Sequence, residues 1–569
     1  MGENSQVLFI ALYEKCQTHI EAYDSLHRLA TTDENEISQI YEKIKSILIE
    51  KNKIDPSVIL SNISYLCYYR NCYLRSYWTI FQKIYEEFQP KSLNNIATIC
   101  QYFLFKEYGV IVDRNKEDYI KQLILDKNYE LDLHENGSIF NIIMHDDKEK
   151  FIYVINGERF NAHQVLVNDF YPKEKIDLLE LCSYHGAVDC FKILRTKFKL
   201  PITQNCLRFS FLSGVLDIVS ECLKFQKVDK ECMKYAIISH NIDFVGYLMD
   251  QANYFINLDL CFDFNNLSAF FVYLDKTNDV NIGLIYAVNF NLYSIIDVLV
   301  SHGASLDTKD DDDVTLLHRA ATWNSKETAQ LLISHGADVN AKMKNGETPL
   351  HFAAKKNSIE TLKLLIENGA NVNMKCENGR TALHSAAFYN KKESAEILID
   401  SGSDVNFKDL RGKTPLHLAA IKNSHETANL LISRGSEVNI KCDDGKTPLH
   451  YAAEMNSQET VQILISNGAK VTIKDKNLKI PLHFAAFWDN TNTVDLLIDH
   501  GSDFNDVDQN GKTPLHYAAF WNCAETAKIL ILYGADIDYV DNDGETPIDI
   551  ALKTNSYSAA QVLVYYANE

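Results

Sequence analysis

Thr315-Leu-Leu-His318, Thr348-Pro-Leu-His351 and Thr381-Ala-Leu-His384 begin a series in which a Leu-His pair returns every 33 residues. The series continues through Thr414-Pro-Leu-His417, Thr447-Pro-Leu-His450, Ile480-Pro-Leu-His483 and Thr513-Pro-Leu-His516, and an altered copy follows at Thr546-Pro-Ile-Asp549. A strict period of this size marks a stacked array of repeats, because each unit buries its apolar face only against its neighbours. Such an array predicts a protein that presents a long surface to a partner.

The residues of one repeat, 348–378, predict two short helices. Thr348 is a natural N-cap, and Pro349 loses no hydrogen bond at the first helical position. Asn357 stands where the first helix must end, since Asn tolerates the left-handed conformation. The matching positions in other repeats hold Asn324, Asn390, Asn423, Asn456 and Asn522. A second helix, rich in Leu and Ile, ends at Gly369, and Asn378-Gly379 makes a hairpin-type turn before the next repeat.

The order of these features resembles the ankyrin repeat over residues 315–569. The resemblance implies an all-α ankyrin-repeat solenoid, in which helix-turn-helix units carry short β-hairpin loops. Departures are few: Ile480 replaces Thr, Asn477-Leu478 lacks the turn glycine, and Asp549 replaces His in the last unit. The polar end, Asn568-Glu569, suits a terminal cap.

The pattern weakens upstream of the array. Ile282-Gly-Leu-Ile-Tyr-Ala287 begins a repeat that has lost Thr-Pro-Leu-His, and earlier helix pairs recur roughly every 25–30 residues, too closely for a full hairpin between them. One such pair is Leu178-Leu-Glu-Leu-Cys182 with Phe191-Lys-Ile-Leu194. Residues 130–310 resemble a degenerate ankyrin-like domain of unknown function that precedes ankyrin arrays in large families from parasitic protists. The resemblance implies no known activity for this region.

Apolar stripes with helical spacing fill residues 1–125. Asp55-Pro56 is an N-cap followed by proline at the first position of one expected helix, and a separate stripe consists of Trp78, Phe81, Ile84, Tyr85 and Phe88. Such stripes predict core faces rather than partner grooves. We therefore expect three regions: a helical N-terminal region at 1–125, degenerate ankyrin-like helical repeats at 126–281, and an ankyrin array at 282–569 with one degenerate unit, about seven regular units and a C-terminal capping unit.

Composition restricts the partner and the compartment. The chain has 569 residues, a formal net charge of −21 and a pI near 5.3. This charge argues against nucleic acid and against an anionic membrane surface, because both need clustered Lys and Arg. No stretch is apolar enough for membrane insertion. The 13 Cys include no Cys-x-x-Cys pair, which favours reduced thiols in an intracellular protein, cytoplasmic or alternatively nuclear.

Two motifs resemble parts of ligand-binding loops, but each lacks a residue that such a loop requires. Gly-Lys-Thr occurs at 412–414, 445–447 and 511–513, but the first glycine of a phosphate-binding loop is absent from all three. Each triplet is therefore interpreted as a hairpin turn followed by a helix cap. Asp506-Val-Asp-Gln-Asn-Gly511 copies the start of a calcium loop, yet its twelfth position holds Tyr517 where a bidentate Glu is required.

The motif histidines also predict structure rather than catalysis. They stand about 10 Å apart, too far to share a metal ion. The resemblance implies that each bonds its own repeat's Thr and neighbouring backbone. Because no Ser, Cys or Lys nucleophile has a recognisable catalytic context, we expect no enzyme, no cofactor and no metal site.

The resemblance places the two residues after each Ala-Ala pair on the concave face, where a partner would bind. The candidate residues are Trp323, Lys355, Lys356, Phe388, Tyr389, Ile421, Lys422, Glu454, Met455, Phe487, Trp488, Phe520 and Trp521. Aromatic residues at repeated exposed positions indicate an interface, because they are enriched at binding hot spots. The alternative is that the rings pack over the adjacent repeat, which is favoured for Phe388, Phe487 and Phe520. Hairpin-tip residues should line the same groove and set specificity by charge: Lys344, Glu377, Arg411, Asp443 and Gln509.

These observations favour a non-enzymatic scaffold that binds a protein partner along the concave face. One alternative is a substrate-recognition adaptor subunit of a larger enzyme complex, such as a ubiquitin ligase, with residues 1–125 docking the complex. A third class, an enzyme within residues 1–310, would need titratable side chains converging in a cleft. The oligomeric state and the identity of the partner do not follow from the sequence.

Overall fold

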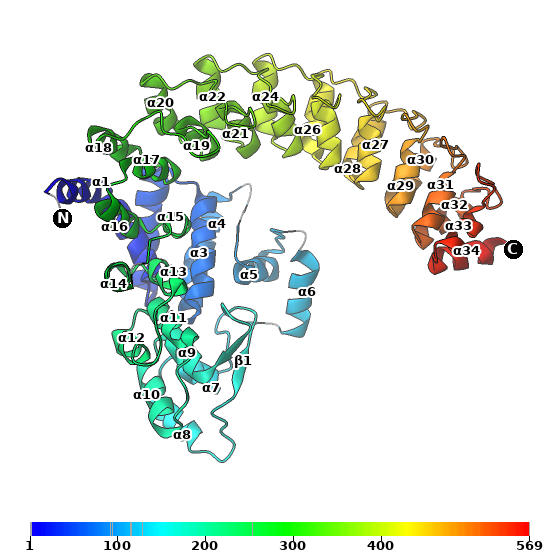
Figure 1. Cartoon of the computed structure of the whole chain (residues 1–569). Coiled ribbons are helices and arrows are strands. Elements are labelled where there is room, and N and C mark those ends of the chain that lie inside the picture. Colours follow the sequence, from blue (N-terminus) through cyan, green and yellow to red (C-terminus); the bar gives the residue numbers. More distant parts are fainter. Residues whose placement is uncertain are drawn as a thin grey trace. The chain divides into compact units, whose positions relative to one another are not determined.

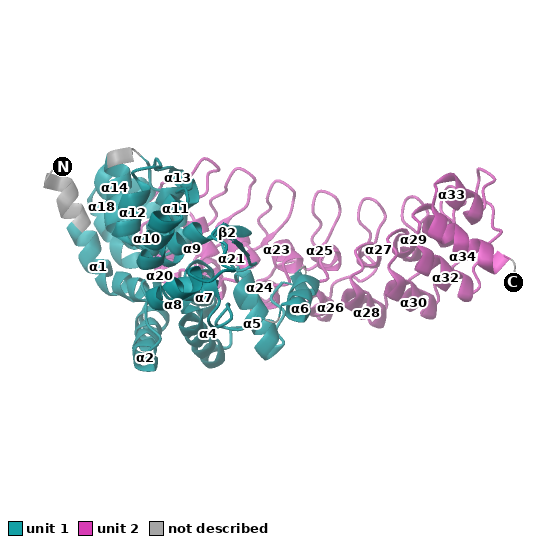
Figure 2. Ribbon diagram, turned by 90° about the horizontal axis from the view of Figure 1, so that it is seen from below, with its two compact units in different colours: residues 1–304 teal, residues 305–569 magenta. Residues whose placement is uncertain are grey.

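The computed structural model describes residues 3–90, 93, 95–113, 116–127, 129–252 and 254–567, so the predicted polar cap Asn568-Glu569 lies outside the described residues. The chain is built almost entirely of helices (Figure 1), which confirms the predicted all-α class. It divides into two compact units, residues 1–304 and 305–569 (Figure 2). In the described part of the chain, none of the helices combines the length and hydropathy needed to cross a bilayer.

The first part of unit 1 is a helical bundle with its own core. Its elements are α1 (Glu3–His27), α2 (Glu34–Lys43), the π-helical η1 (Ile44–Lys51), α3 (Pro56–Tyr69), the short η2 (Asn71–Tyr73), α4 (Leu74–Phe88), α5 (Thr98–Tyr108) and α6 (Glu117–Asp126). Helix α3 starts as predicted, because the Asp55 side chain accepts the Ser57 N–H and Pro56 occupies the first turn.

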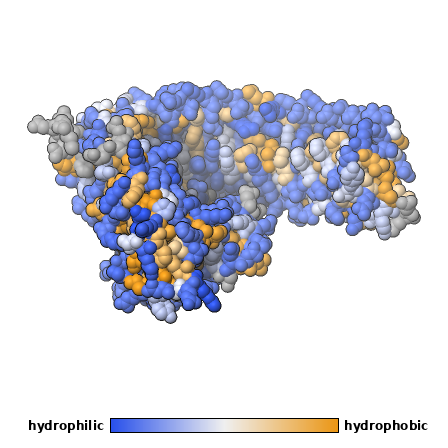
Figure 3. All heavy atoms as spheres, turned by 60° about the horizontal axis from the view of Figure 1, so that its bottom comes forward, coloured by the Kyte–Doolittle hydropathy of each residue, from blue (hydrophilic) through white to orange (hydrophobic). Residues whose placement is uncertain are grey.

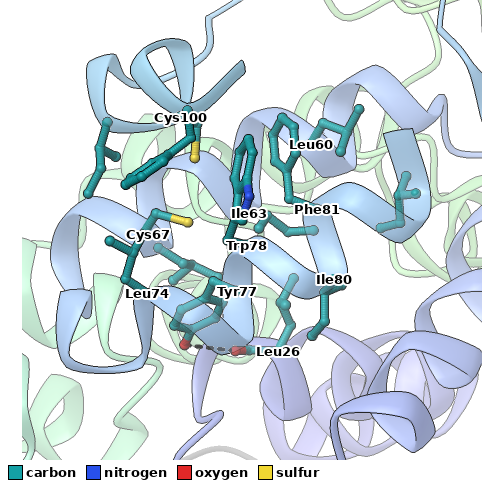
Figure 4. Close-up of a cluster of buried hydrophobic side chains, with 14 of the residues drawn as sticks. Leu26, Leu60, Ile63, Cys67, Leu74, Tyr77, Trp78, Ile80, Phe81 and Cys100 are labelled. Carbon is teal, nitrogen blue, oxygen red and sulfur yellow. Dashed lines mark hydrogen bonds between the residues drawn. The ribbon is translucent and has the colours of Figure 1, made fainter. Parts of the chain in front are cut away.

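The aromatic stripe of α4 forms the centre of this core, as predicted. Trp78 and Phe81 are fully buried and stacked, with ring centroids 5.0 Å apart. Figure 4 shows Tyr77 pointing toward Leu26, and its hydroxyl donates to the Leu26 carbonyl at 3.1 Å. Tyr85 is only partly buried against the same cluster. The stripe therefore holds the bundle together and leaves little of itself for a partner.

The rest of unit 1 consists of short helix pairs. Its elements are α7 (Ile139–Met144), α8 (Lys148–Ile155), β1 (Val165–Val167), β2 (Lys175–Asp177), α9 (Leu178–His185), α10 (Val188–Lys197), α11 (Gln204–Ser213), α12 (Leu216–Cys222), α13 (Lys230–Ile238), α14 (Ile242–Ala252), α15 (Leu258–Asp263), α16 (Leu267–Thr277), α17 (Val280–Asn289), η4 (Tyr293–Ile295) and α18 (Ile296–Ser301). Helix α11 packs between α9 and α13, so the first helices of successive pairs stack.

One expectation for this region is wrong. The connection between α8 and α9 is long enough for an antiparallel hairpin, in which Leu166 of β1 lies opposite Ile176 of β2. Both side chains are buried, whereas Val165 and Val167 are exposed, so the strands alternate as a half-buried sheet does. Unit 1 also extends to residue 304, beyond the boundary placed at 281, and the predicted domain limits stay predictions.

Unit 2 is a stack of helix pairs that follows an arc (Figure 1). The first helices are α19 (Leu316–Thr322), α21 (Pro349–Lys356), α23 (Ala382–Phe388), α25 (Pro415–Ile421), α27 (Pro448–Glu454), α29 (Pro481–Phe487), α31 (Pro514–Phe520) and α33 (Pro547–Lys553). The second helices are α20 (Lys326–Ser334), α22 (Ile359–Glu367), α24 (Lys392–Asp400), α26 (His425–Ser433), α28 (Gln458–Ser466), α30 (Thr491–Asp499), α32 (Ala524–Leu532) and α34 (Tyr557–Ala567). Each first helix packs on the next first helix, and each second helix on the next second helix.

A histidine in each first helix from α19 to α31 fastens its repeat to the next. In repeat 348–378, the His351 Nδ1 accepts the Thr348 N–H at 3.2 Å, and its Nε2 donates to the Arg380 carbonyl at 3.0 Å. Because a carbonyl only accepts, the ring must be neutral with its proton on Nε2. The same pair of bonds recurs at six further positions, which together with His351 we call the histidine ladder: His318, His384, His417, His450, His483 and His516.

A second ladder explains why Asn follows the first helix. Asn390 has a left-handed φ of +53°, as predicted for a residue that ends a helix. Its side-chain Oδ1 also accepts the Thr427 N–H of the next repeat at 3.2 Å. Side chains of the same position accept N–H groups from the second helix of the following repeat at Asn324, Asn357, Asn423, Asp489 and Asn522, and Asn456 accepts the Thr493 hydroxyl there. This set with Asn390 is the asparagine ladder. A glycine there would satisfy the backbone but could not link the repeats.

Candidate partner-binding surface

The residues predicted to meet a partner lie at the last turn of the first helices. The two preceding alanines are fully buried, for example Ala386 and Ala387, so the chain emerges from the core at this point. The second residue of every pair is exposed: Trp323, Lys356, Tyr389, Lys422, Met455, Trp488 and Trp521. The first residue is half-buried at Lys355, Phe388, Ile421, Glu454 and Phe487, and exposed at Phe520. We call these thirteen residues the first-helix surface.

Four aromatic rings on this surface form one contiguous group. The Phe487 ring lies 4.9 Å from Trp488 and 4.7 Å from Trp521 of the next repeat, measured between centroids. Phe520 lies 5.1 Å from Trp521. Phe487 thus packs on its neighbours, whereas Trp488 and Trp521 remain 56% and 51% exposed. Packing between repeats and exposure to a partner therefore coexist in this group.

Three of the predicted residues line a hollow of about 180 Å³ nearer the N-terminal end of the array. Lys355, Phe388 and Tyr389 form one side, and the Lys355 Nζ lies 5.2 Å from the centre of the Tyr389 ring. Hairpin residues, among them Asn345 and Arg380, form the other side. The hollow shows that first helices and hairpins share one surface.

The hairpins stand in a bonded row along unit 2 (Figure 2). The Glu377 N–H donates to the Asn345 carbonyl at 2.8 Å, and the Asp443 N–H donates to the Arg411 carbonyl at 3.0 Å. Among the described residues of unit 2 the hairpin legs form only an isolated bridge, between Lys309 and Thr315, instead of regular strands. The bonds hold the hairpin tips at fixed positions beside the first helices.

Comparison with known protein families follows the same division of the chain. Residues 258–343, 341–409, 401–475 and 482–569 match the family described as ankyrin repeats in three copies, and these matches cover more than half of the chain. The chain belongs to the ankyrin-repeat family. Residues 198–273 match a domain of unknown function, DUF3447, in the region where a degenerate ankyrin-like domain was expected. No curated protein matches the chain. Ankyrin repeats indicate a role in protein–protein interaction.

The predicted hairpin-tip residues of the ankyrin array are all exposed: Lys344, Glu377, Arg411, Asp443 and Gln509. All five take part in the backbone bonds of the hairpin row. On the face of the molecule drawn in Figure 3, apolar side chains form separate groups within a mainly hydrophilic surface. The aromatic group at 487–521 is thus a local feature of the ankyrin array, next to tips of mixed charge.

Sequence reasoning missed a row of cations beside this surface. The residue before the capping Thr or Ile is basic in five successive ankyrin repeats, and we call this set the basic track: Arg380, Lys413, Lys446, Lys479 and Lys512. All five are half-buried. Three of these lysines, Lys413, Lys446 and Lys512, are the lysines of the Gly-Lys-Thr triplets. Their recurrence at one position of the repeat is what carries information.

Other candidate groups, in the ankyrin array and in unit 1, have structural explanations. Asp541, Asp543 and Glu545 lie close enough to hold a metal ion, but the Asp541 Oδ1 accepts the N–H groups of the other two residues, as in the equivalent turns. Lys512 lies 3.7 Å from the other Asp541 oxygen. Burial raises the pKa of the Cys206 and Cys523 thiols to about 11, which keeps them protonated and weakly nucleophilic.

Proposed function

We propose that this chain is a non-enzymatic scaffold that binds a segment of a partner protein along the concave, first-helix surface of its ankyrin array. The observation that carries the proposal is the contiguous aromatic group of Phe487, Trp488, Phe520 and Trp521. Trp and Phe each bury roughly 150–250 Å² in an interface and dominate its energetics. Half-exposed tryptophans on neighbouring repeats therefore supply the anchors that a partner segment needs.

The rigidity of the array supports the same role. The histidine and asparagine ladders and the hairpin row fix each repeat against the next, so the aromatic anchors need little ordering when a partner binds. The buried Ala-Ala pairs let first helices approach closely, whereas second helices meet through larger side chains such as Leu398 and Leu431. Closer spacing on one side bends a stack toward that side, which favours a concave first-helix surface.

The thiols support an expectation about the compartment. All 13 cysteines are free, and all but Cys72 and Cys376 are buried. We extend the proposal to an intracellular location, because reduced thiols persist in the cytosol and nucleus. The alternative adaptor role depends on residues 1–125 docking a larger complex. The aromatic stripe of that region is buried in the core of unit 1, so it supplies no docking face.

Affinity capture from native cells with mass spectrometry tests the proposal. The test variant combines Trp323, Tyr389, Trp488 and Trp521→Ala, and the matched control replaces four exposed rings outside the first-helix surface: Tyr153, Phe255, Tyr293 and Tyr557→Ala. Circular dichroism verifies that both fold like the wild type. We expect specific partners to be lost only with the test variant. If the same partners persist on it, the rings serve packing and the proposal fails.

A further inference from the structure

The basic track contrasts with the charge of the chain that carries it. Five cations recur at a spacing of 33 residues in a protein of net charge −21. A second series of lysines occupies the other leg of four of these hairpins and of the two hairpins before them: Lys309, Lys342, Lys375, Lys408, Lys441 and Lys474. The five hairpins at 342–347, 375–380, 408–413, 441–446 and 474–479 together carry twelve Lys or Arg and six Asp or Glu, so this part of the hairpin row is positive within an acidic molecule. Such a local reversal of sign attracts partners of opposite charge.

Aromatic rings hold the lysines of the track in place. The Lys413 Nζ lies 4.3 Å from the centre of the Tyr451 ring, the Lys446 Nζ 4.0 Å from Phe484, and the Lys479 Nζ 4.5 Å from Tyr517. Each of these rings belongs to the first helix of the repeat that follows its lysine. Cations and rings thus alternate along the edge of the first-helix surface, so the ammonium groups are positioned before any partner arrives.

Two lysines of the basic track have no carboxylate partner among the described residues. Arg380 pairs with Asp409, Lys446 with Glu454 and Lys512 with Asp541. For Lys413 and Lys479, no carboxylate of the described residues lies within ion-pair distance of the ammonium group. Partial burial lowers the pKa of Lys413, so desolvation already opposes its charge. An anion bound beside it would relieve that penalty.

The track and the first-helix surface are continuous. Arg380 lines the same hollow as Lys355, Phe388 and Tyr389. Lys446 pairs at 2.8 Å with Glu454, a residue of the first-helix surface. A segment lying across the aromatic anchors would therefore pass directly along the cations.

We propose that the partner segment is an extended, acidic polypeptide whose carboxylates pair with the basic track. The inference rests on the proposed function and specifies the chemistry of its partner. Packed helices lie about 8–10 Å apart, and an extended chain advances about 3.3 Å per residue. One cation per repeat therefore matches one carboxylate about every third residue of the bound segment. Glu or Asp at that spacing, with apolar residues between them for the aromatic group, fits both features.

The geometry favours a polypeptide over a single-stranded nucleic acid. Base stacking along the cations needs open ring faces beside them, but lysines already lie over the rings that border the track, Tyr451, Phe484 and Tyr517. The net charge of −21 also repels a phosphate backbone beyond the track itself. Nucleic-acid binding is therefore an outcome that would overturn the assignment.

Fluorescence anisotropy with the full chain tests the inference. The probe is a labelled peptide of about fifteen residues with Glu at every third position, which spans about five repeats, and a second probe carries Gln in place of Glu. The test variant is Lys413→Gln with Lys479→Gln, chosen because neither lysine supports an ion pair. The control is Lys363→Gln with Lys392→Gln, two exposed lysines on second helices, which changes the net charge equally.

We expect the Glu probe to bind more tightly than the Gln probe and to weaken as salt rises. The track variant should bind it roughly fivefold to tenfold more weakly, since each exposed ion pair contributes a few-fold in affinity. The control variant should bind like the wild type. Equal binding of both probes, wild-type binding by the track variant, or tighter binding of an oligothymidine of the same length would each overturn the inference. If cellular partners are lost with the aromatic variant but kept by the track variant, the proposed function stands and the acidic partner is wrong.

Discussion

Acidification should unfold the ankyrin array through its buried histidines, and His417 offers a direct measure of the effect. Its Nδ1 accepts the Thr414 N–H at 3.1 Å and its Nε2 donates to the Lys446 carbonyl at 3.2 Å, so only the neutral ring makes both bonds. Burial lowers the pKa of His417 from 6.5 to about 4. The unfolded chain therefore binds a proton that the folded chain does not, and the free energy of unfolding falls as the pH drops from about 6.5 toward 4.

A shift of this size removes about 2 kcal/mol of stability per histidine between about pH 7 and pH 5. We expect the wild type to lose about 2 kcal/mol more over that interval than His417→Gln, which lacks the titrating ring. Urea unfolding followed by circular dichroism at both pH values measures the difference. His335→Gln, whose side chain is exposed, is the matched control. Equal losses in the wild type and His417→Gln would refute the conclusion that the fold holds this ring neutral.

Three further predictions test the packing. Gly379 and Gly402 have φ values of +74° and +93°, but only a Cβ at 379 would lie 2.8 Å from the Leu410 backbone nitrogen. In urea unfolding, Gly379→Ala and Gly402→Ala should each lose roughly 1–2 kcal/mol from left-handed strain, with a clear extra loss at 379; equal losses would contradict the close approach of the two hairpins. Asn390→Gly should lose about 1 kcal/mol with its bond to Thr427, and Asn390→Ala should lose more because it also strains the backbone. If thermal unfolding shows Asn390→Ala to be more stable than Asn390→Gly, this explanation is wrong. Phe81→Ala should lower the free energy of unfolding of unit 1 by about 3–5 kcal/mol and speed its proteolysis. Phe255→Ala, at an exposed position, should change neither. If Phe81→Ala is as stable as the wild type, the core is not centred on Phe81.

The regular repeats could be predicted because their signals are local. Thr348, Pro349 and Asn357 each act on the backbone within one turn of their own position, so the sequence indicates where helix α21 begins and ends. The role of Asn357 in linking repeats was not visible, because its partner Ser394 lies 37 residues away in a different element. In unit 1, the strands β1 and β2 are three residues each, too short for an alternating pattern to stand out.

For the candidate surface as well, local features could be predicted from the sequence, whereas contacts between repeats could not. Exposure of Trp488 and Trp521 follows from their position after the buried Ala-Ala pair, which the sequence displays. The contact between Phe487 and Trp521 depends on how neighbouring repeats lie, which no single repeat encodes. The basic track is visible only when the repeats are compared, because Lys413 and Lys446 share one position of the repeat. The triplet around each lysine does not reveal it.

The two ladders give the ankyrin array a direction, and that direction determines how it can be lengthened. Each histidine reaches forward, as His516 does when its Nε2 donates to the Glu545 carbonyl of the following unit. In that unit Asp549 accepts the N–H and hydroxyl of its own Thr546 instead. An extra copy of 33 residues inserted ahead of Thr546 would meet a matching donor and acceptor at both of its ends. A fragment of a copy would leave both unmatched, so duplication or deletion preserves the fold only in whole repeats.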